Sequence, residues 1–234
     1  MHDVSSAFGT ALHLIATLDP DLIEIVGLSL GVSLSAVALA TLVGLPLGAA
    51  VALFAFPGRR LVAALLNAFM GLPPVVVGLI VYLMLSRAGP LGALGLLFTP
   101  TAMIIAQCLL VTPIIAALAR QTIADLNEEY DETLSTLGAG PMARIATLLW
   151  DGRYALLTAV LAGFGRASAE VGAVMIVGGN IDHVTRVMTT AIALETSKGN
   201  LALALGLGLI LIALSLAING AALGLRDASR RIYG

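Results

Sequence analysis

Long apolar stretches, separated by short polar segments, dominate the pattern of residues along the chain. A helix needs about 20 mostly apolar residues to cross the hydrocarbon of a bilayer. The pattern therefore predicts an all-α integral membrane protein with five core transmembrane helices. The predicted spans lie at about residues 32–56, 61–85, 101–119, 154–177 and 201–225.

The first apolar stretch covers residues 22–56 and is too long for one upright span. Glu24, Gly27 and Gly31 interrupt its first half. The stretch predicts either one long, tilted helix or an extra N-terminal interfacial helix that leads into the span at 32–56.

Composition supports a membrane location. Of the 234 residues, 59% are hydrophobic and 11% are charged, whereas soluble domains carry about 25% charged residues. A soluble fold of this size has no room to bury so much apolar surface, so we expect membrane lipid around the chain. The formal net charge of -2 gives no reason to expect nucleic acid as a partner.

Lysine and arginine residues in the short loops predict the orientation of the chain. The loops on one side carry Arg59, Arg60, Arg120, Arg144, Arg153, Arg226, Arg230 and Arg231, and those on the other side carry Arg87, Arg186 and Lys198. The richer side is expected to be cytoplasmic, with the N-terminus outside and the C-terminus inside. This organisation comprises an external segment at 1–21, one transmembrane domain at 22–225, a cytoplasmic loop at 121–151 and a cytoplasmic tail at 226–234.

The loop at 121–151 has its own helical pattern. Gly138 suits the position just after a helix, and Pro141 suits the first turn of the next one, so we expect a compact helix-turn-helix. The stripe that predicts its first helix, at 124–137, consists of Leu126, Tyr130, Leu134 and Leu137. The alternative is a solvated acidic connector, but apolar stripes on both helices argue against it because they must pack on something.

Two features lie inside the predicted spans. Arg166 falls near the middle of span 154–177, and Glu170 follows at i+4, so both are expected on one helix face. Such a pair either holds the span to its neighbours or lines a path for an anion. Pro73 and Pro74 remove two backbone donors and predict a kinked or unwound helix, which is either a passive kink or a segment near a gate.

Catalytic chemistry is not predicted for this chain. A phosphate-binding P-loop needs Gly-Lys-Ser/Thr, and the one lysine, Lys198, lies in Ser-Lys-Gly. The three histidines are scattered without metal-ligand spacing. We expect neither a catalytic site nor a metal site, and energised transport would need a separate nucleotide-binding subunit.

Four segments resemble one family of transporters. The run Glu-Thr-Leu-Ser-Thr-Leu-Gly-Ala-Gly at 132–140 resembles the cytoplasmic coupling loop of type I ABC importer permeases. Residues 72–78, 166–173 and 180–186 are similar to segments of molybdate permeases, and the order matches over roughly 25–225. The details after Asn180 resemble the tungstate-type branch most.

The resemblance has departures within the loop. Thr133 and Leu134 stand where the family has two alanines, and Trp150 and Asp151 replace the Leu-Pro that usually closes the loop. The small family residues allow close approach to the ATPase, so these departures affect the expected docking geometry more than docking itself.

The resemblance implies a permease subunit that acts as a homodimer in the bacterial or archaeal cytoplasmic membrane. It further implies a cytoplasmic ABC ATPase dimer, which binds ATP and Mg, and an external substrate-binding protein, with no cofactor in this chain. The implied coupling residues are Asp131, Glu132, Gly138, Ala139, Gly140 and Arg144, and the path or gate candidates are Pro73, Pro74, Arg166 and Glu170.

The implied substrate is an oxyanion, with tungstate ahead of molybdate. Three rival hypotheses remain at this point. The chain is a permease for another solute such as sulfate, phosphate or an amino acid; it is a stand-alone secondary transporter or channel; or it is an intramembrane enzyme. The sequence does not separate tungstate from molybdate, because a separate binding protein is expected to set that selectivity.

Overall fold

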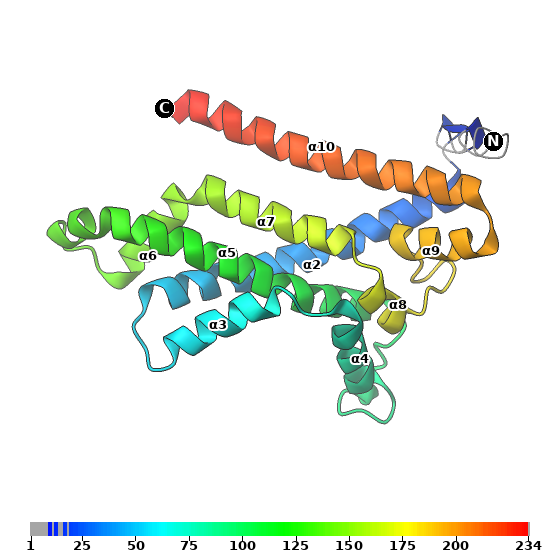
Figure 1. Ribbon diagram of the computed structural model, residues 1–234, viewed down its shortest axis with the longest axis horizontal. Coiled ribbons are helices and arrows are strands. Elements are labelled where there is room, and N and C mark those ends of the chain that lie inside the picture. Colours follow the sequence, from blue (N-terminus) through cyan, green and yellow to red (C-terminus); the bar gives the residue numbers. More distant parts are fainter. Residues whose placement is uncertain (1–8, 11, 14–15, 18, 234) are drawn as a thin grey trace. The chain divides into compact units, whose positions relative to one another are not determined.

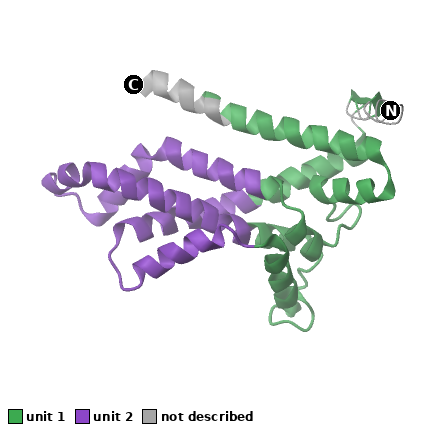
Figure 2. Ribbon diagram, viewed as in Figure 1, with its two compact units in different colours: residues 1–35, 73–107, 167–234 green, residues 36–72, 108–166 purple. Residues whose placement is uncertain are grey.

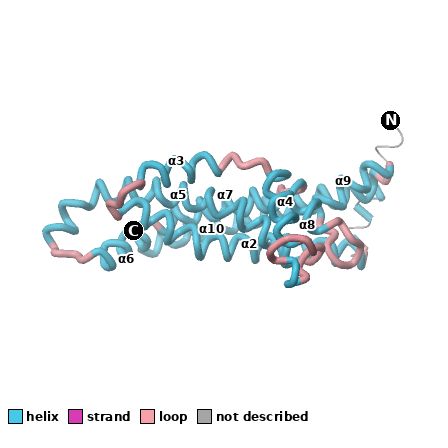
Figure 3. Tube along the Cα trace, turned by 90° about the horizontal axis from the view of Figure 1, so that it is seen from below, coloured by secondary structure: helices cyan, strands magenta, loops and turns pink. Residues whose placement is uncertain are grey.

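The computed structural model describes residues 9–10, 12–13, 16–17 and 19–233, and this part of the chain consists of helices and loops (Figures 1 and 3). The predicted external segment at 1–21 and the end of the predicted tail, residue 234, fall largely or wholly outside the described residues. The elements are α2 (Pro20–Leu53), α3 (Arg59–Phe69), α4 (Pro74–Leu85), η1 (Gly92–Leu94), α5 (Pro100–Thr136), α6 (Pro141–Asp151), α7 (Arg153–Ser168), α8 (Gly172–Gly178), α9 (Met188–Lys198) and α10 (Leu201–Tyr233).

Several of these helices are long and apolar enough to cross a membrane. α2, α5 and residues 201–221 of α10 each meet that requirement alone. Two interrupted pairs, α3 with α4 and α6 with α7, raise the number to five if each pair counts as one span, by length and composition. The helical content of the described chain agrees with the all-α prediction.

The first apolar stretch forms one helix. α2 runs without interruption for 34 residues, a length of about 50 Å at the usual rise of a helix. Of the two alternatives that the sequence left open, the single long helix is therefore the one found, and Glu24, Gly27 and Gly31 all lie within it.

The two prolines of the second stretch interrupt it, as predicted. α3 ends at Phe69 and α4 begins at Pro74, with residues 70–73 outside helical structure. Pro73 has extended backbone angles, and Pro74 occupies the start of α4, where its missing N–H leaves no helical hydrogen bond unmade. The stretch at 61–85 therefore consists of two helices that are bent by 104° relative to each other.

The third and fourth stretches differ from their predicted boundaries. The span at 101–119 and the amphipathic helix at 124–137 form one helix, α5, because residues 120–123 contain neither glycine nor proline and no chain feature ends the helix at a membrane surface. The span at 154–177 is instead divided between α7 and α8, with residues 169–171 outside both helices. The prediction of one continuous helix there is wrong.

The described chain divides into two compact units, coloured separately in Figure 2. Unit 1 comprises the described residues of 1–35, 73–107 and 167–234. One apolar cluster of this unit joins α2, α9 and α10 through Leu22, Ile25, Met188, Ala191 and Leu207. In the same unit α4 packs closely on α8, because Gly78 leaves room for the backbone of Ala173.

Unit 2 comprises residues 36–72 and 108–166. An apolar cluster of this unit joins α2, α5, α6 and α7 through Ala49, Ala52, Ala119, Ile123, Leu134, Leu148 and Leu156. α2 and α5 approach closely at Gly48, where an added Cβ would lie 2.5 Å from the carbonyl oxygen of Ala116. The guanidinium of Arg59 donates to the carbonyls of Val51 and Ala52 and so caps the C-terminal end of α2.

Candidate functional site

The C-terminal end of α5 turns sharply into α6 within unit 2. Gly138 has a φ of 66°, in the left-handed region that glycine adopts easily. The N–H of Ala139 donates to the carbonyl of Leu134, and the N–H of Gly138 donates to that of Ser135. These two bonds form a Schellman motif, which ends α5 and satisfies its last carbonyls. The predicted helix stop at Gly138 is therefore confirmed.

α6 begins at Pro141 and folds back on α5, so the predicted helix-turn-helix is present. Leu134 of α5 and Leu148 of α6 are both buried in the apolar cluster of unit 2. α6 then meets α7 at an angle of 71°. We call residues 121–151 the hairpin, because they comprise the end of α5, the turn and α6. The apolar stripes of its two helices are partly buried against each other and α7.

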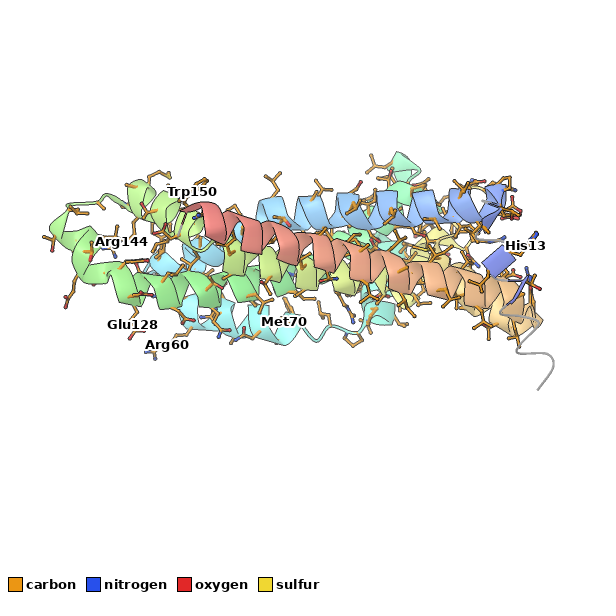
Figure 4. All side chains as sticks on the ribbon, turned by 90° about the horizontal axis from the view of Figure 1, so that it is seen from above. His13, Arg60, Met70, Glu128, Arg144 and Trp150 are labelled. Carbon is orange, nitrogen blue, oxygen red and sulfur yellow. The ribbon has the colours of Figure 1, made fainter. Side chains whose placement is uncertain are left out.

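Arg144 connects the two helices of the hairpin. Its Nη1 donates to Oδ1 of Asp131 at 2.7 Å and to Oδ1 of Asn127 at 3.2 Å. Its Nη2 donates to Oγ of Ser135 at 3.0 Å. Figure 4 shows Arg144 on the inner side of the hairpin and Glu128 on its outer side. The structure thus brings together two of the sequence candidates, Asp131 and Arg144.

The tip of the hairpin exposes apolar side chains. Leu137 is 75% exposed and Met142 is 78% exposed, on either side of the glycine turn. Glu132, which precedes Leu137 in α5, is also exposed. A Cβ added at Gly138 or Gly140 would meet no other atom within 4 Å. The predicted stripe residue Leu137 therefore does not pack within the hairpin, and the tip presents apolar and acidic groups together.

Glu170 lies in the break between α7 and α8, within unit 1. It is only 4% exposed, and its Oε1 accepts a hydrogen bond of 3.0 Å from the N–H of Ala173 in the first turn of α8. Its backbone carbonyl accepts a 2.8 Å bond from Oγ1 of Thr189 at the start of α9. The carboxyl group thus accepts from an N-terminal N–H of α8. It lies at the positive end of the dipole of that helix, where a negative charge is stabilised.

The expectation that Arg166 and Glu170 share a face of one helix is wrong. α7 ends at Ser168, so Arg166 lies in its last turn and Glu170 lies beyond it. In the break at 169–171, the side chain of Glu170 accepts from a main-chain N–H of the next helix, as Asp, Asn and Ser side chains often do at helix starts. A spacing of four residues indicates a shared face only while the helix continues.

The loop between α8 and α9 is also held by side chains in unit 1. Thr185 is buried, and its Oγ1 donates to the carbonyl of Gly178 and accepts from the N–H of Ile181. His183 contacts Glu24 of α2, with 2.9 Å between Nδ1 and Oε2. The hydrogen bond and charge of Glu24, with smaller contributions from Asp182 and Asp21, raise the pKa of His183 above its ordinary value.

Sequence reasoning missed two partners of Arg144 and one of Glu170. Asn127 and Ser135 flank Asp131 at four-residue intervals, and that spacing was a usable signal for a polar stripe on one helix face. Thr189 gave no signal, because it meets Glu170 only through the folded chain. Within the described residues, no group of three or more His, Cys, Asp or Glu side chains is arranged to hold a metal ion.

Comparison with known proteins defines the family. The family model described as "Binding-protein-dependent transport system inner membrane component" matches residues 44–227. The chain belongs to this family. It therefore has the type I ABC importer permease fold, and it is a multi-pass membrane subunit of the permease type.

Individual relatives agree with this assignment. The chain is 42% identical over 227 residues to the tungstate uptake system permease protein TupB of Peptoclostridium acidaminophilum, covering 97% of this chain and 100% of that protein. It is 42% identical over 212 residues to a probable anion ABC transporter permease protein of Haloferax volcanii, covering 88% and 91%. Identity to the sulfate transport system permease protein CysW of Escherichia coli is 32% over 184 residues, covering 75% and 63%.

Proposed function

We propose that this permease carries an oxyanion into the cell, with tungstate as the first candidate and molybdate as the second. Near-complete coverage at 42% identity to a tungstate uptake permease supports tungstate, and a similar identity to a probable anion permease supports an anion more generally. Sulfate is the rival substrate, because a sulfate permease matches with lower identity and coverage. Phosphate and amino acids have less support.

The hairpin is the segment that we propose to couple this chain to its ATPase. A tip with Leu137 and Met142 exposed at the end of a hydrogen-bonded turn offers an apolar surface to a partner protein. We assign docking of a separate ATPase to this tip and its neighbours, with ATP and Mg bound by that partner. The proposed coupling residues are Asp131, Glu132, Gly138, Ala139, Gly140 and Arg144.

The rest of the assembly follows from the proposed coupling. Two copies of the chain form one path between them, the N-terminus lies outside, and the C-terminus and the hairpin lie in the cytoplasm. Arginines near the hairpin favour this orientation. An external binding protein delivers the anion, and ATP binding drives the path from inward-open to outward-open.

Four residues remain candidates for the path or its gate. Pro73 and Pro74 interrupt a stretch of apolar chain, and Arg166 and Glu170 lie next to a second interruption. Non-helical backbone at membrane depth is tolerated only where protein or a water-filled cavity surrounds it. We therefore assign the two breaks to the region that opens and closes, with Glu170 acting through its contacts to α8 and α9.

ATP hydrolysis in proteoliposomes tests this function. The vesicles contain this chain, its ATPase and its binding protein, and tungstate, molybdate or sulfate is added. Stimulation by tungstate at the lowest concentration is expected. Stimulation by sulfate alone would agree with an ABC importer but would contradict tungstate as its substrate. Transport without nucleotide would favour a stand-alone transporter.

A pair of glycine variants tests the coupling site. Gly138→Asp is expected to abolish the stimulation, because it puts a charge at the docking surface. Gly199→Asp is the matched control, since Gly199 also has a positive φ of 82° and open space around it but lies on the proposed external side. Equal loss in both variants would indicate backbone strain and would contradict a docking site at Gly138.

A further inference from the structure

The part of α5 that enters the hairpin has two adjacent stripes. One is apolar and includes Ile123 and Leu134, which are buried against α6 and α7. The other is polar and consists of Asn127, Asp131 and Ser135, which recur at every fourth position and so lie along one face of the helix. α6 therefore meets α5 through an apolar contact with a polar contact beside it.

One side chain makes the polar contact. The guanidinium of Arg144 donates to all three residues of the polar stripe, over distances of 2.7 to 3.2 Å. These acceptors span two turns of α5. Arg144 itself lies in the first turn of α6, and its own N–H donates to the carbonyl of Gly140. We call Arg144 and its three acceptors the arginine clamp.

The two stripes differ in what they determine. Apolar contact is non-directional, so it holds α6 against α5 without strictly fixing the angle between them. A guanidinium carries its donors in a rigid planar fork, so bonds to three acceptors restrict that angle. The clamp also closes the chain segment 135–144, which contains both exposed tip residues, Leu137 and Met142.

Stability is a poor explanation for the clamp. The side chain of Asp131 is 57% exposed, and exposed ion pairs contribute little to folding because water screens them. The buried contacts of Leu134 and Leu148 already hold the hairpin together.

We propose that Arg144 is a positioning residue for coupling: its clamp makes α6 and the end of α5 move as one body. The inference rests on the proposed function of the hairpin. A force applied by the ATPase at the tip is then passed to α5 and onward along that helix. Without the clamp, α6 pivots on its apolar contact, and the same force moves α6 alone.

The first test measures coupling in the reconstituted complex with tungstate as the probe. Arg144→Gln is expected to keep ATPase binding but to lower the amount of anion transported per ATP about fivefold or more, the lower end of usual coupling effects between sites. The double variant Asp131→Arg with Arg144→Asp restores the pair with reversed charge and is expected to recover most of the ratio. Arg153→Gln is the control, because Arg153 contacts Trp150 and Tyr154 close to it in the chain.

Two outcomes would overturn the proposal. An unchanged transport ratio in Arg144→Gln would show that the clamp does not position the hairpin. Loss of the ATPase from the Arg144→Gln complex would show that Arg144 serves docking itself. If the wild-type complex responds to none of the anions, the proposed substrate fails, and the next measurement tests the clamp independently.

The second test measures the hairpin directly. Spin labels are placed on Glu128→Cys of α5 and Thr147→Cys of α6, both exposed, in a chain with Cys108→Ala. Pulsed electron resonance then gives the distribution of distances between the labels. Arg144→Gln is expected to broaden that distribution, and the charge-reversed double variant is expected to narrow it again. A distribution that stays equally narrow in Arg144→Gln contradicts the clamp.

Discussion

Glu170 illustrates how one carboxylate can have two explanations. The sequence predicted that Glu170 shares a helix with Arg166. The structure instead has Glu170 beyond the end of α7, where its carboxyl group accepts from the N–H of Ala173 and its backbone carbonyl accepts from the hydroxyl of Thr189. These contacts fix the start of α8 and join it to α9. A structural contribution of Glu170 is therefore established by its bonds, and a contribution to the anion path is a separate hypothesis.

Two substitutions of Glu170 distinguish these contributions. Glu170→Gln retains an acceptor for the N–H of Ala173, so it is expected to destabilise the chain less than Glu170→Ala does. Glu170→Ala leaves that buried donor unpaired and is expected to lower the free energy of unfolding by about 1–3 kcal/mol. Denaturant unfolding in detergent measures both. Equal stability of Glu170→Ala and the wild type would contradict the cap, and altered anion transport in Glu170→Gln at unchanged stability would support the path.

His183 predicts a pH-dependent contact. Because Glu24 raises the pKa of His183, the contact favours the folded state fully below about pH 6.5, the ordinary histidine value. The benefit is lost as the pH rises through the folded-state pKa, where the imidazole becomes neutral. The difference in Tm between the wild type and His183→Gln is therefore expected to be largest at low pH and to vanish at high pH. A Tm difference that grows as the pH rises would contradict this prediction.

At the scale of elements, close helix contacts depend on single glycines. An added Cβ at Gly78 of α4 would lie 2.7 Å from the Cα of Ala173 in α8. Small residues let membrane helices approach in this way. α4 and α8 would have to move apart to accept any larger residue, since backbone atoms cannot rotate away as a side chain can.

Gly78→Ala tests this contact. It is expected to destabilise the chain by about 1–3 kcal/mol, as overpacking does. Gly208→Ala in α10 is the matched control, because an added Cβ there meets no atom within 4 Å, and alanine favours a helix over glycine. Thermal unfolding of both variants in detergent gives the comparison. Equal destabilisation would show that the effect comes from glycine loss in general.

At the scale of the whole molecule, the proposed importer depends on contact with an ATPase. The double variant Leu137→Asp with Met142→Asp is expected to weaken ATPase binding about tenfold or more, because two exposed apolar contacts are replaced by charges. Both positions are exposed, so the fold is expected to persist.

Copurification of the tagged chain with its ATPase measures this loss. Val184→Asp serves as the control, because Val184 is an exposed apolar residue of the α8–α9 loop, on the proposed external side. If the double variant captures as much ATPase as the wild type does, the tip is not part of the docking surface.

Features that short stretches of chain specify could be predicted from the residues alone. Apolar runs of sufficient length predicted helices for a membrane. Gly138 and Pro141 predicted the end of one helix and the start of the next, and Pro73 with Pro74 predicted an interruption; all of these are present. Such signals are reliable because backbone angles and missing donors act on the residue itself or its immediate neighbours.

The contacts between residues far apart in the chain could not be predicted from the sequence and are seen only in the folded protein. The bond that Thr189 donates to Glu170 and the three acceptors of Arg144 depend on how separate helices pack. A spacing of four residues corresponds to a shared helix face for Asn127, Asp131 and Ser135, which the sequence analysis did not use, but not for Arg166 and Glu170, for which it did. The physical reason is that periodicity describes a helix that continues, whereas competition between main-chain and side-chain hydrogen bonds decides where a helix ends.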